Sequence, residues 1–367
     1  MGKYRVCVYA IARDELQFAE RWYASVQEAD GVYVLDTGST DGTPERLRAL
    51  GAHVMEKEII PWRFDDARNA SLELVPEDCD ICVCVDLDEV FHPGWRAAME
   101  RVWGETVRQL RYRYTWSFLP DGGEGHVFWL EKAHARRGFQ WVNPVHEVLR
   151  YTGDDPLVTA EAVGVQLDHL PDPKKSRAQY LPLLELAVQE DPENDRNMHY
   201  LGREYLFHGQ WRSCEETLKR HLSLPAARWP EERCASMRYL ARALLRQGKG
   251  GEAEQWLYRA IGEAPYLREP WLEAAELARI RSDWPACLHF AEAALQITER
   301  SRSYITEGEN WGARPYDLSA LAAYYLGLYD LALRRGEAAL ALSPDDPRLA
   351  ENLRFYREKA GKNSERT

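Results

Sequence analysis

The sequence predicts an α/β domain with a doubly wound, mainly parallel sheet, followed by an all-α solenoid of helical repeats. Over the first hundred residues, short apolar segments alternate with amphipathic segments, which is typical of a sheet with right-handed crossovers. From about residue 176 the composition changes to helix formers with a sustained internal period, which is typical of repeat proteins. We therefore expect domains at residues 1–175 and 176–361, and a polar tail at residues 362–367.

The first strand is expected at residues 4–11, a β-branched and aromatic run that ends in Ala12-Arg13-Asp14-Glu15. Leu16 to Gln27 has apolar residues at helical spacing and predicts the first helix. Further elements are expected at residues 31–35 (strand), 44–50 (helix) and 52–55 (strand).

The loop from Asp36 to Thr43 joins the second strand to the second helix. A carboxylate at a strand end can accept hydrogen bonds from a ribose hydroxyl, and Gly38 and Gly42 permit close approach of the backbone to a ligand. The alternative is an ordinary turn in which Asp41 or Thr43 caps the helix.

Ile81 to Val85 is an apolar run that leads directly into Asp86, Asp88 and Glu89. Such a run predicts a strand buried on both faces, and ligands of open α/β sheets bind beyond the carboxyl ends of the strands. Because side chains alternate along a strand, we expect Asp86 and Asp88 on one side. Paired carboxylates favour a hard cation such as Mg²⁺ or Mn²⁺. The alternative is a solvated strand terminus.

Four blocks of the sequence together resemble the family 2 glycosyltransferases. The blocks are Ala12-Arg13-Asp14-Glu15, the loop from Asp36 to Thr43, Trp62-Arg63-Phe64-Asp65-Asp66-Ala67-Arg68-Asn69, and the Asp-x-Asp motif Asp86-Leu87-Asp88-Glu89. The resemblance implies the GT-A fold and a nucleotide-diphosphate sugar, such as a UDP-sugar, as the donor. It also implies that Asp36 and Asp86 contact the nucleoside, while Asp88 ligates the cation that bridges the diphosphate.

The donor-binding residues that this resemblance implies lie within the four blocks. They are Ala12, Arg13, Glu15, Asp36, Arg68, Asp86 and Leu87. For Arg68 the alternative is a charge on the surface of a helix.

The same resemblance implies a glycine loop, an acidic base and a metal-binding histidine after the Asp-x-Asp strand. Arg137-Gly138-Phe139, Val145-His146-Glu147 and Leu167-Asp168-His169 follow in this order. Glu147 is then the general base that deprotonates the acceptor, with Asp168 as another candidate. His169 is a metal ligand and His146 the competing ligand, although either histidine could be structural. The family usually has a Glu-Asp pair where this chain has His146-Glu147, which leaves the choice between neighbours open.

Four segments of the second half follow the tetratricopeptide spacing. One carries Leu240, Ala241, Leu244, Gly248, Ala253, Leu257, Ala260 and Pro265; the others run through residues 201–218, 271–294 and 320–344. The alternative is an unspecific helical bundle. A solenoid of this kind binds peptides or protein segments, so we expect a protein or peptide acceptor. The insertion from Arg300 to Asp317, which contains Trp311, is expected on a binding face, where it would contact the acceptor, the first domain or a second subunit of a homodimer.

The whole chain has 367 residues and a formal net charge of -12, which argues against a large nucleic-acid-binding surface. It has no apolar stretch long enough for a transmembrane segment and no signal-peptide core at its start. With seven cysteines, these features predict reduced thiols in the cytoplasm.

The function that the sequence predicts is metal-dependent, inverting transfer of a sugar from a nucleotide-diphosphate sugar to a protein or peptide. One alternative is a repeat-based binding or scaffold protein whose first domain binds the nucleotide sugar without transferring it. Another is a glycosyltransferase that acts on a glycan or a nucleic acid.

Overall fold

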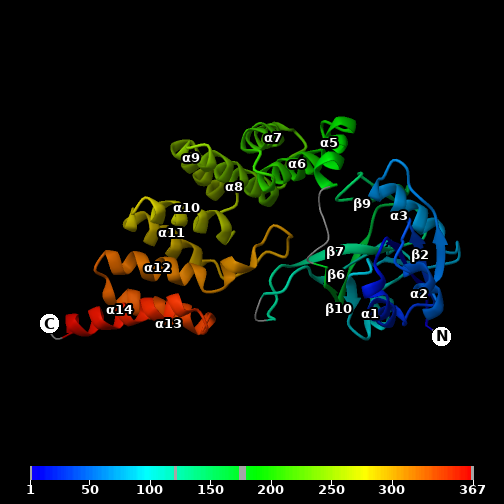
Figure 1. Cartoon of the computed structure of the whole chain (residues 1–367), viewed down its shortest axis with the longest axis horizontal. Coiled ribbons are helices and arrows are strands. Elements are labelled where there is room, and N and C mark those ends of the chain that lie inside the picture. Colours follow the sequence, from blue (N-terminus) through cyan, green and yellow to red (C-terminus); the bar gives the residue numbers. More distant parts are fainter. Residues whose placement is uncertain (1, 120–121, 173–178, 365–367) are drawn as a thin grey trace. The chain divides into compact units, whose positions relative to one another are not determined.

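The computed structural model describes residues 2–119, 122–172 and 179–364, with side chains as far as Gly361. The chain divides into two compact units, Met1–Pro192 and Glu193–Thr367, the first α/β and the second helical (Figure 1). The junction predicted between residues 175 and 176 lies outside the described residues, as does the end of the predicted tail.

The first unit alternates strands and helices as far as α4 and is then mainly β. Its elements are β1 (Val6–Ala12), α1 (Leu16–Val26), β2 (Gly31–Asp36), α2 (Thr43–Leu50), β3 (His53–Glu56), α3 (Phe64–Glu73), β4 (Ile81–Cys84), β5 (Glu89–Phe91), α4 (Trp95–Val102), β6 (Gln109–Thr115), β7 (Val127–His134), β8 (Phe139–Val142), β9 (Val148–Tyr151), β10 (Thr159–His169) and α5 (Tyr180–Glu190).

The main sheet of this unit is mixed, with the strand order β3-β2-β1-β4-β7-β6-β10-β5 in the described residues. The half formed by β3, β2, β1 and β4 is parallel, as predicted. In the other half β7 runs antiparallel to β4 and β6, and β5 runs antiparallel to β10. β10, however, runs parallel to β6. The expectation of a mainly parallel sheet therefore holds for the first half and for the β6–β10 pair. β6 and β7 follow each other without an intervening helix, and parallel neighbours need a long crossover.

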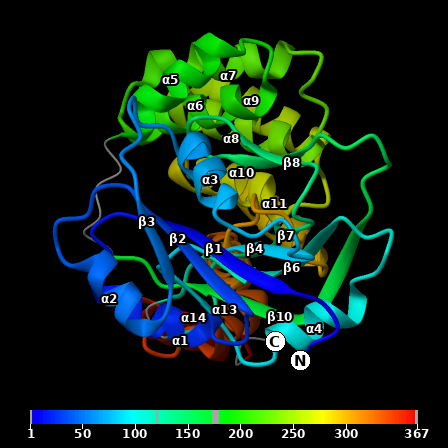
Figure 2. The same cartoon turned by 90° about the vertical axis from the view of Figure 1, so that its right-hand side faces the viewer.

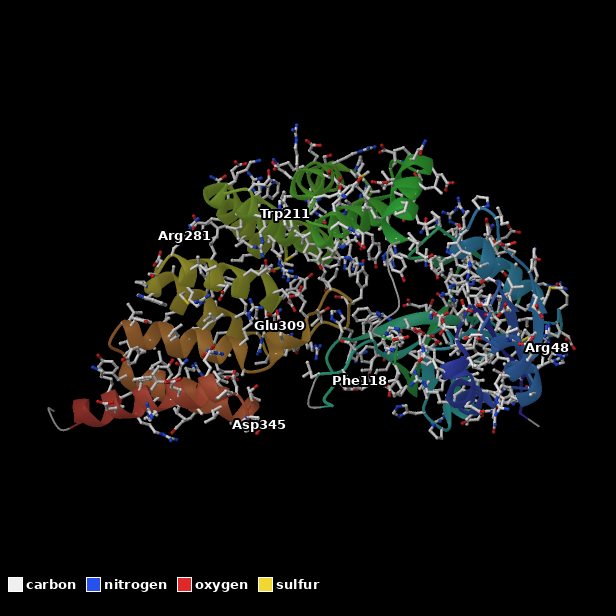
Figure 3. All side chains as sticks on the ribbon, viewed as in Figure 1. Arg48, Phe118, Trp211, Arg281, Glu309 and Asp345 are labelled. Carbon is white, nitrogen blue, oxygen red and sulfur yellow. The ribbon has the colours of Figure 1, made fainter. Side chains whose placement is uncertain are left out.

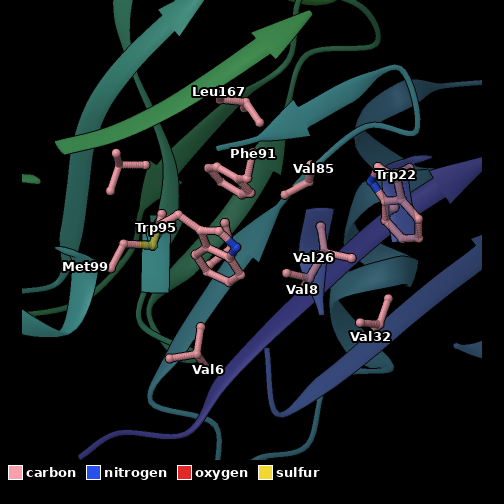
Figure 4. Close-up of a cluster of buried hydrophobic side chains, with 14 of the residues drawn as sticks. Val6, Val8, Trp22, Val26, Val32, Val85, Phe91, Trp95, Met99 and Leu167 are labelled. Atoms are coloured by element: carbon pink, nitrogen blue, oxygen red, sulfur yellow. The ribbon is translucent and has the colours of Figure 1, made fainter. Parts of the chain in front are cut away.

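Alternation along β1 divides the core of the first unit between the two faces of the sheet. Val6 and Val8 belong to a large apolar cluster that includes side chains of α1 and α4 (Figure 4). Cys7 and Tyr9 belong to a smaller cluster with Leu72 of α3. Figure 2 shows α1 and α2 on one side of the parallel strands and α3 on the other. The face covered by α3 is therefore separate from the face that holds the main core.

The helix α5 belongs to the first unit, although the sequence placed its residues with the repeats. The Phe64 and Tyr180 rings meet edge to face with centroids 6.1 Å apart, and Arg63 Nη1 lies 2.6 Å from Glu190 Oε1. These contacts tie both ends of α5 to the start of α3, so helical composition alone did not reveal where the first unit ends.

The second unit consists of antiparallel helix pairs, which confirms the predicted repeat architecture. Its elements are α6 (Asp195–Phe207), α7 (Trp211–Ser223), α8 (Pro230–Arg246), α9 (Gly250–Glu263), α10 (Arg268–Ile280), α11 (Trp284–Gln296), the 3-10 helix η1 (Gly308–Trp311), α12 (Arg314–Tyr325), α13 (Tyr329–Leu342) and α14 (Pro347–Ser364).

Each pair is joined by a short turn with one residue in the left-handed region. These residues are Gly209, Gly248, Ser282 and Gly327, with φ between 59° and 75°. Small residues let the two helices of a pair approach closely: a Cβ built on Gly202 of α6 would lie 2.3 Å from Leu218 of α7. The recurring glycines that the sequence showed therefore mark both turns and close helix contacts.

All seven cysteines are buried and none forms a disulfide. Among the described residues, no helix combines the length and apolar composition that a bilayer crossing requires.

Candidate functional site

The Asp-x-Asp sequence forms a tight turn where an extended strand was expected. β4 ends at Cys84, and Glu89 N–H donates to the Asp86 carbonyl at 2.9 Å. The Glu89 carboxylate closes the turn by accepting from Asp86 N–H at 2.8 Å. The alternation argument therefore fails beyond Cys84, and Asp86 and Asp88 have different partners.

Asp86 forms two ion pairs on the face of the sheet that α3 covers. Arg68 Nη1 lies 2.7 Å from Asp86 Oδ1, and its Nη2 lies 3.1 Å from Oδ2. Lys132 Nζ lies 2.9 Å from the same Oδ2. Burial alone would raise the pKa of Asp86, but the charges of Arg68 and Lys132 outweigh it and hold the pKa well below its usual range. Asp86 is therefore a stable anion between two cations.

Lys132 was not predicted as part of the site. It also binds Glu89, with Nζ 2.8 Å from Oε1 and 3.0 Å from Oε2. Burial lowers the pKa of Lys132, but Asp86 and Glu89 raise it well above the usual value. Cys82 of β4 pairs with His134 of antiparallel β7, and continuing this register places Lys132 beside the end of β4. No local signal in the sequence indicates this pairing.

Arg68 links Asp86 to Glu147, the predicted base. Its Nε is bonded to Glu147 Oε1, and its guanidinium lies 5.1 Å from the Trp141 ring centroid. Arg68 is only 6% exposed, so the alternative of a surface charge is excluded. The structure thus brings Arg68, Asp86 and Glu147 together, but the Glu147 carboxylate is held by a guanidinium.

Asp88 lies beside His169, which ends β10. Asp88 Oδ2 is 3.3 Å from His169 Nε2, and His169 Nδ1 is 2.9 Å from the carbonyl oxygen of Trp116. Burial lowers the pKa of His169, but the hydrogen bond with Asp88 outweighs it and raises the pKa above its ordinary value. The Trp116 carbonyl orients the ring so that Nε2 points to Asp88, an arrangement typical of histidines that bind metals.

His146, the competing metal ligand, lies elsewhere. Its ring packs edge to face on Tyr180 of α5 with centroids 5.6 Å apart, and its backbone has a φ of 51°. The geometry therefore favours His169 as the partner of Asp88.

Within the described ranges, no group of three or more His, Cys, Asp or Glu side chains is arranged to hold a metal ion. Asp88 and His169 would supply two ligands. Mg²⁺ commonly binds through one or two carboxylates and completes its coordination with substrate phosphates and water. The pair therefore fits a cation that arrives with a phosphorylated ligand, and not a permanent structural ion.

Asp36 is buried and already bound by its own loop. It accepts hydrogen bonds from Gly38 N–H at 3.0 Å, Ser39 N–H at 2.8 Å and Ser39 Oγ at 2.5 Å. A nucleoside would have to compete with these donors. Asp41 accepts from Thr43 N–H, at the start of α2, and from Leu16 N–H, at the start of α1, each at 3.0 Å. The expected turn in which Asp41 binds the start of α2 is therefore present, and Asp41 binds the start of α1 as well.

The other predicted donor-binding residues are divided between core and surface. Ala12 and Leu87 lie in the main apolar core. Arg13 is exposed, while Glu15 is buried, with its N–H donating to Thr43 Oγ1 at 2.9 Å. Of these, only Arg13 presents a side chain to a ligand without rearrangement.

A buried hydrogen-bond network lies behind Arg68. Trp141 Nε1 donates to Tyr9 Oη at 2.9 Å, and Tyr9 Oη lies 2.8 Å from His134 Nε2. His134 Nδ1 lies 2.8 Å from the Ala135 carbonyl. If Nδ1 carries the proton, every member of this chain is satisfied while His134 is neutral.

This network predicts that the first unit is sensitive to acid. Burial lowers the pKa of His134 to about 4, whereas an unfolded histidine titrates near 6.5. Between these values the unfolded chain binds more protons, so stability should fall as the pH drops from about 6.5 to about 4, by on the order of 3 kcal/mol. Pulsed hydrogen exchange of β1 in urea would measure this. His134→Gln should flatten the dependence, and an unchanged slope would contradict the assignment.

No family model and no curated protein matches the chain. Solved structures similar to it include MamA, with 18% identity and a TM-score of 0.37 over 46% of this chain and 89% of MamA. PilF of Pseudomonas aeruginosa has 15% identity and a TM-score of 0.38 over 48% of this chain and 72% of its own. YrrB, described as a TPR protein with an unusual peptide-binding site, has 14% identity and a TM-score of 0.37 over 48% and 82%. These values say nothing about the function of this chain.

The predicted membership in the family 2 glycosyltransferases is wrong. No family model matches the chain, and the similar structures named above match about half of it and include repeat proteins. The GT-A fold that the resemblance implied is not confirmed, and the sheet is mixed. Three of the four blocks lie at or after the ends of β1, β2 and β4, where turn residues such as Asp are common. The block Trp62–Asn69 instead forms the start of α3.

Proposed function

We propose that the chain is a repeat-based binding protein whose first unit binds a nucleoside diphosphate sugar together with Mn²⁺ or Mg²⁺. The proposal rests on one observation, the 3.3 Å approach of Asp88 Oδ2 and His169 Nε2. The two residues come from a turn after β4 and from the end of β10. They offer a carboxylate oxygen and an imidazole nitrogen, to which a diphosphate would add the remaining oxygen ligands.

The charges around this pair support an anionic ligand that brings its own cation. Arg68 and Lys132 are shared among three carboxylates, Asp86, Glu89 and Glu147. Neither cation pairs with Asp88 in these contacts, and the Asp88 carboxylate lies beside a histidine. When bound, a divalent cation would neutralise the diphosphate and stabilise it as a leaving group. The protein would contribute the orientation of His169 through the Trp116 carbonyl.

The second unit would bind a protein or peptide. Stacked helix pairs offer an extended surface for such ligands, and the first helices of three successive pairs, α6, α8 and α10, carry buried polar side chains such as His199, Arg238 and Glu269. The chain would thereby hold a nucleotide sugar and a polypeptide.

Transfer of the sugar to that polypeptide is a second candidate function. It is favoured by the position of Glu147, which Arg68 connects to the turn that carries Asp88. In the described structure Arg68 binds only Oε1 of Glu147, so as a general base Glu147 would accept the proton of the acceptor hydroxyl on Oε2. The ion pair between Arg68 and Glu147 gives this carboxylate a structural role, and this role is consistent with a protein that binds the nucleotide sugar without transferring the sugar.

Release of UDP from UDP-sugars in Mn²⁺, followed with intact-mass measurement of the polypeptides present, separates the two functions. If transfer occurs, Glu147→Gln should reduce turnover about a hundredfold or more while donor affinity is kept. Asp168→Asn is the matched control, since Asp168 lies 2.8 Å from His92 and should retain turnover. Saturable binding without UDP release in the parent would support a binding protein. Loss of turnover only in Asp168→Asn would identify Asp168, and not Glu147, as the general base.

A further inference from the structure

The segment between α11 and α12, residues 297–313, lies across the first helices of the preceding repeats. We call the surface formed by α6, α8 and α10 the first-helix face. The described contacts of the segment with α6 and α8 are made by Ser301, Tyr304 and Glu307. Further along, Arg268 of α10 bonds to the Ile297 carbonyl and stacks on Trp311 at 4.0 Å. The insertion, which the sequence predicted on a binding face, thus covers the first-helix face itself.

Two side chains of the segment bind the first-helix face through several contacts each, and the first of them is Tyr304. Its hydroxyl donates to Glu232 Oε2 at 2.6 Å. Its ring is stacked on Tyr200, with an interplanar angle of 18°, and meets Trp229 edge to face at 5.4 Å. Arg196 lies over the same ring at 5.4 Å. An aromatic side chain with a hydrogen-bond donor is therefore recognised on both its ring and its hydroxyl.

Glu307 is the second, three residues later. Its carboxylate lies 2.8 Å from Arg238 Nη2 and 3.4 Å from Arg242 Nη2, and its N–H donates to Glu269 Oε1 at 3.0 Å. Burial alone would raise the pKa of Glu307, but the two arginines outweigh it and lower the pKa to about 2. The face therefore binds both the backbone and the side chain of Glu307, which precedes η1.

The apolar cores of the helix pairs are complete without this segment. Among the described residues, none between 297 and 313 belongs to the apolar clusters that hold the helix pairs together. Arg238 would keep its other partner, Glu273 Oε1 at 2.5 Å, if Glu307 left. The segment does not satisfy the face completely either, since Arg238 Nη1 and Glu269 Oε2 are buried without a hydrogen-bond partner. Leaving the face would therefore expose the aromatic and polar contacts of Tyr304 and the buried side chain of Ile305, but it would remove no member of the apolar clusters of the helix pairs.

We infer that residues 301–310 are a resident ligand of the first-helix face, and that the partner which replaces them is an acidic protein segment with Tyr three residues before Glu that adopts the same turn. This inference deepens the proposed binding of a protein or peptide by the second unit. The partner must supply a hydroxyl for Glu232 and a carboxylate for Arg238 and Arg242. Because the resident segment is part of the same chain, its effective concentration is high and free peptides should bind the parent weakly.

The test uses the full chain and a fluorescent synthetic peptide with the sequence of residues 299–312. Tyr304→Ala combined with Glu307→Ala in the protein should release the resident segment, so that anisotropy shows the peptide binding at least tenfold more tightly than to the parent. Glu309→Ala is the matched control (Figure 3), since this exposed carboxylate of the same segment pairs only locally with Arg314 in the described structure. A peptide with alanine at both positions should not bind.

Equal affinity of the parent and the double variant, or equal binding of the alanine peptide, would overturn the inference. If circular dichroism shows that the double variant has lost its helices, the inference is tested instead by hydrogen exchange of the parent protein. Millimolar parental peptide should then accelerate hydrogen exchange in residues 301–310, whereas neither binding nor faster exchange would mean that the segment is a fixed part of the fold. No nucleotide is present in these measurements, so their failure leaves the nucleotide-binding proposal standing.

Discussion

Replacing Arg68 with alanine should destabilise the first unit by about 3–5 kcal/mol, the usual cost of leaving a buried charge without its partner. The substitution would deprive Glu147 of its ion pair and leave Asp86 with Lys132 alone. It would also remove the contact between the guanidinium and the Trp141 ring. Because the second unit has its own core, its helices should keep their stability.

Native-state hydrogen exchange of β1 and β4 measures this change in the free energy of unfolding. Arg48→Ala is a suitable control (Figure 3), since Arg48 and Glu56 form a pair on the surface in which both side chains are substantially exposed. Such pairs contribute about 0–1 kcal/mol. A loss below 1 kcal/mol in Arg68→Ala would mean that Asp86 and Glu147 find other partners or water, and that the network does not fix this face of the sheet.

Much of the fold follows from local patterns in the sequence. The apolar run at Ile81–Cys84 is a buried strand with a parallel neighbour, β1, and an antiparallel neighbour, β7. Its lack of polar residues predicted that it would be buried. The repeat spacing correctly located the helix pairs, since Gly209 and Gly248 occupy equivalent turns. These features depend on contacts between residues that are close in the chain, and such contacts leave a periodic signal.

The site was less predictable because its contacts are distant in the sequence. Lys132 reaches Asp86 and Glu89 only because antiparallel β7 lies beside β4, and a single sequence does not reveal which strands pair. The expectation that Asp86 and Asp88 share a face assumed an extended strand. Because Glu89 closes a turn at this point, Asp86 contacts Lys132 and Asp88 contacts His169.

The misassigned family has a similar origin. Asp36 and Asp41 do the structural work of closing a loop and capping α1, so their presence does not require a nucleotide. His169 lies beside Asp88 because β10 pairs with β5, with His169 opposite Glu89, and because Leu170 N–H donates to the Asp88 carbonyl at 2.7 Å. That pairing places the two backbones, and the approach of Asp88 Oδ2 to His169 Nε2 adds a contact between two side chains of types that bind metal ions. This is why the proposed ligand site rests on that pair and not on the motif that first suggested it.

Asp88→Asn should remove the metal dependence of nucleotide binding. The amide keeps the size of the side chain but loses the charge that a divalent cation requires, so the diphosphate would lose the ion that bridges it to the protein. We expect the parent to bind UDP at least tenfold more tightly in Mn²⁺ than in chelator, which is about 1.4 kcal/mol. Asp78→Asn is the matched control, an exposed carboxylate before the opposite, amino-terminal end of β4.

Isothermal titration of UDP into the full chain, with Mn²⁺ and with chelator, is the most direct test of the proposed function. If the first unit binds the nucleotide through a cation on Asp88, UDP should bind more tightly in Mn²⁺ than in chelator to the parent and to Asp78→Asn, and equally weakly in both conditions to Asp88→Asn. The same metal dependence in Asp88→Asn as in the parent, or no binding of UDP by the parent in either condition, would contradict it.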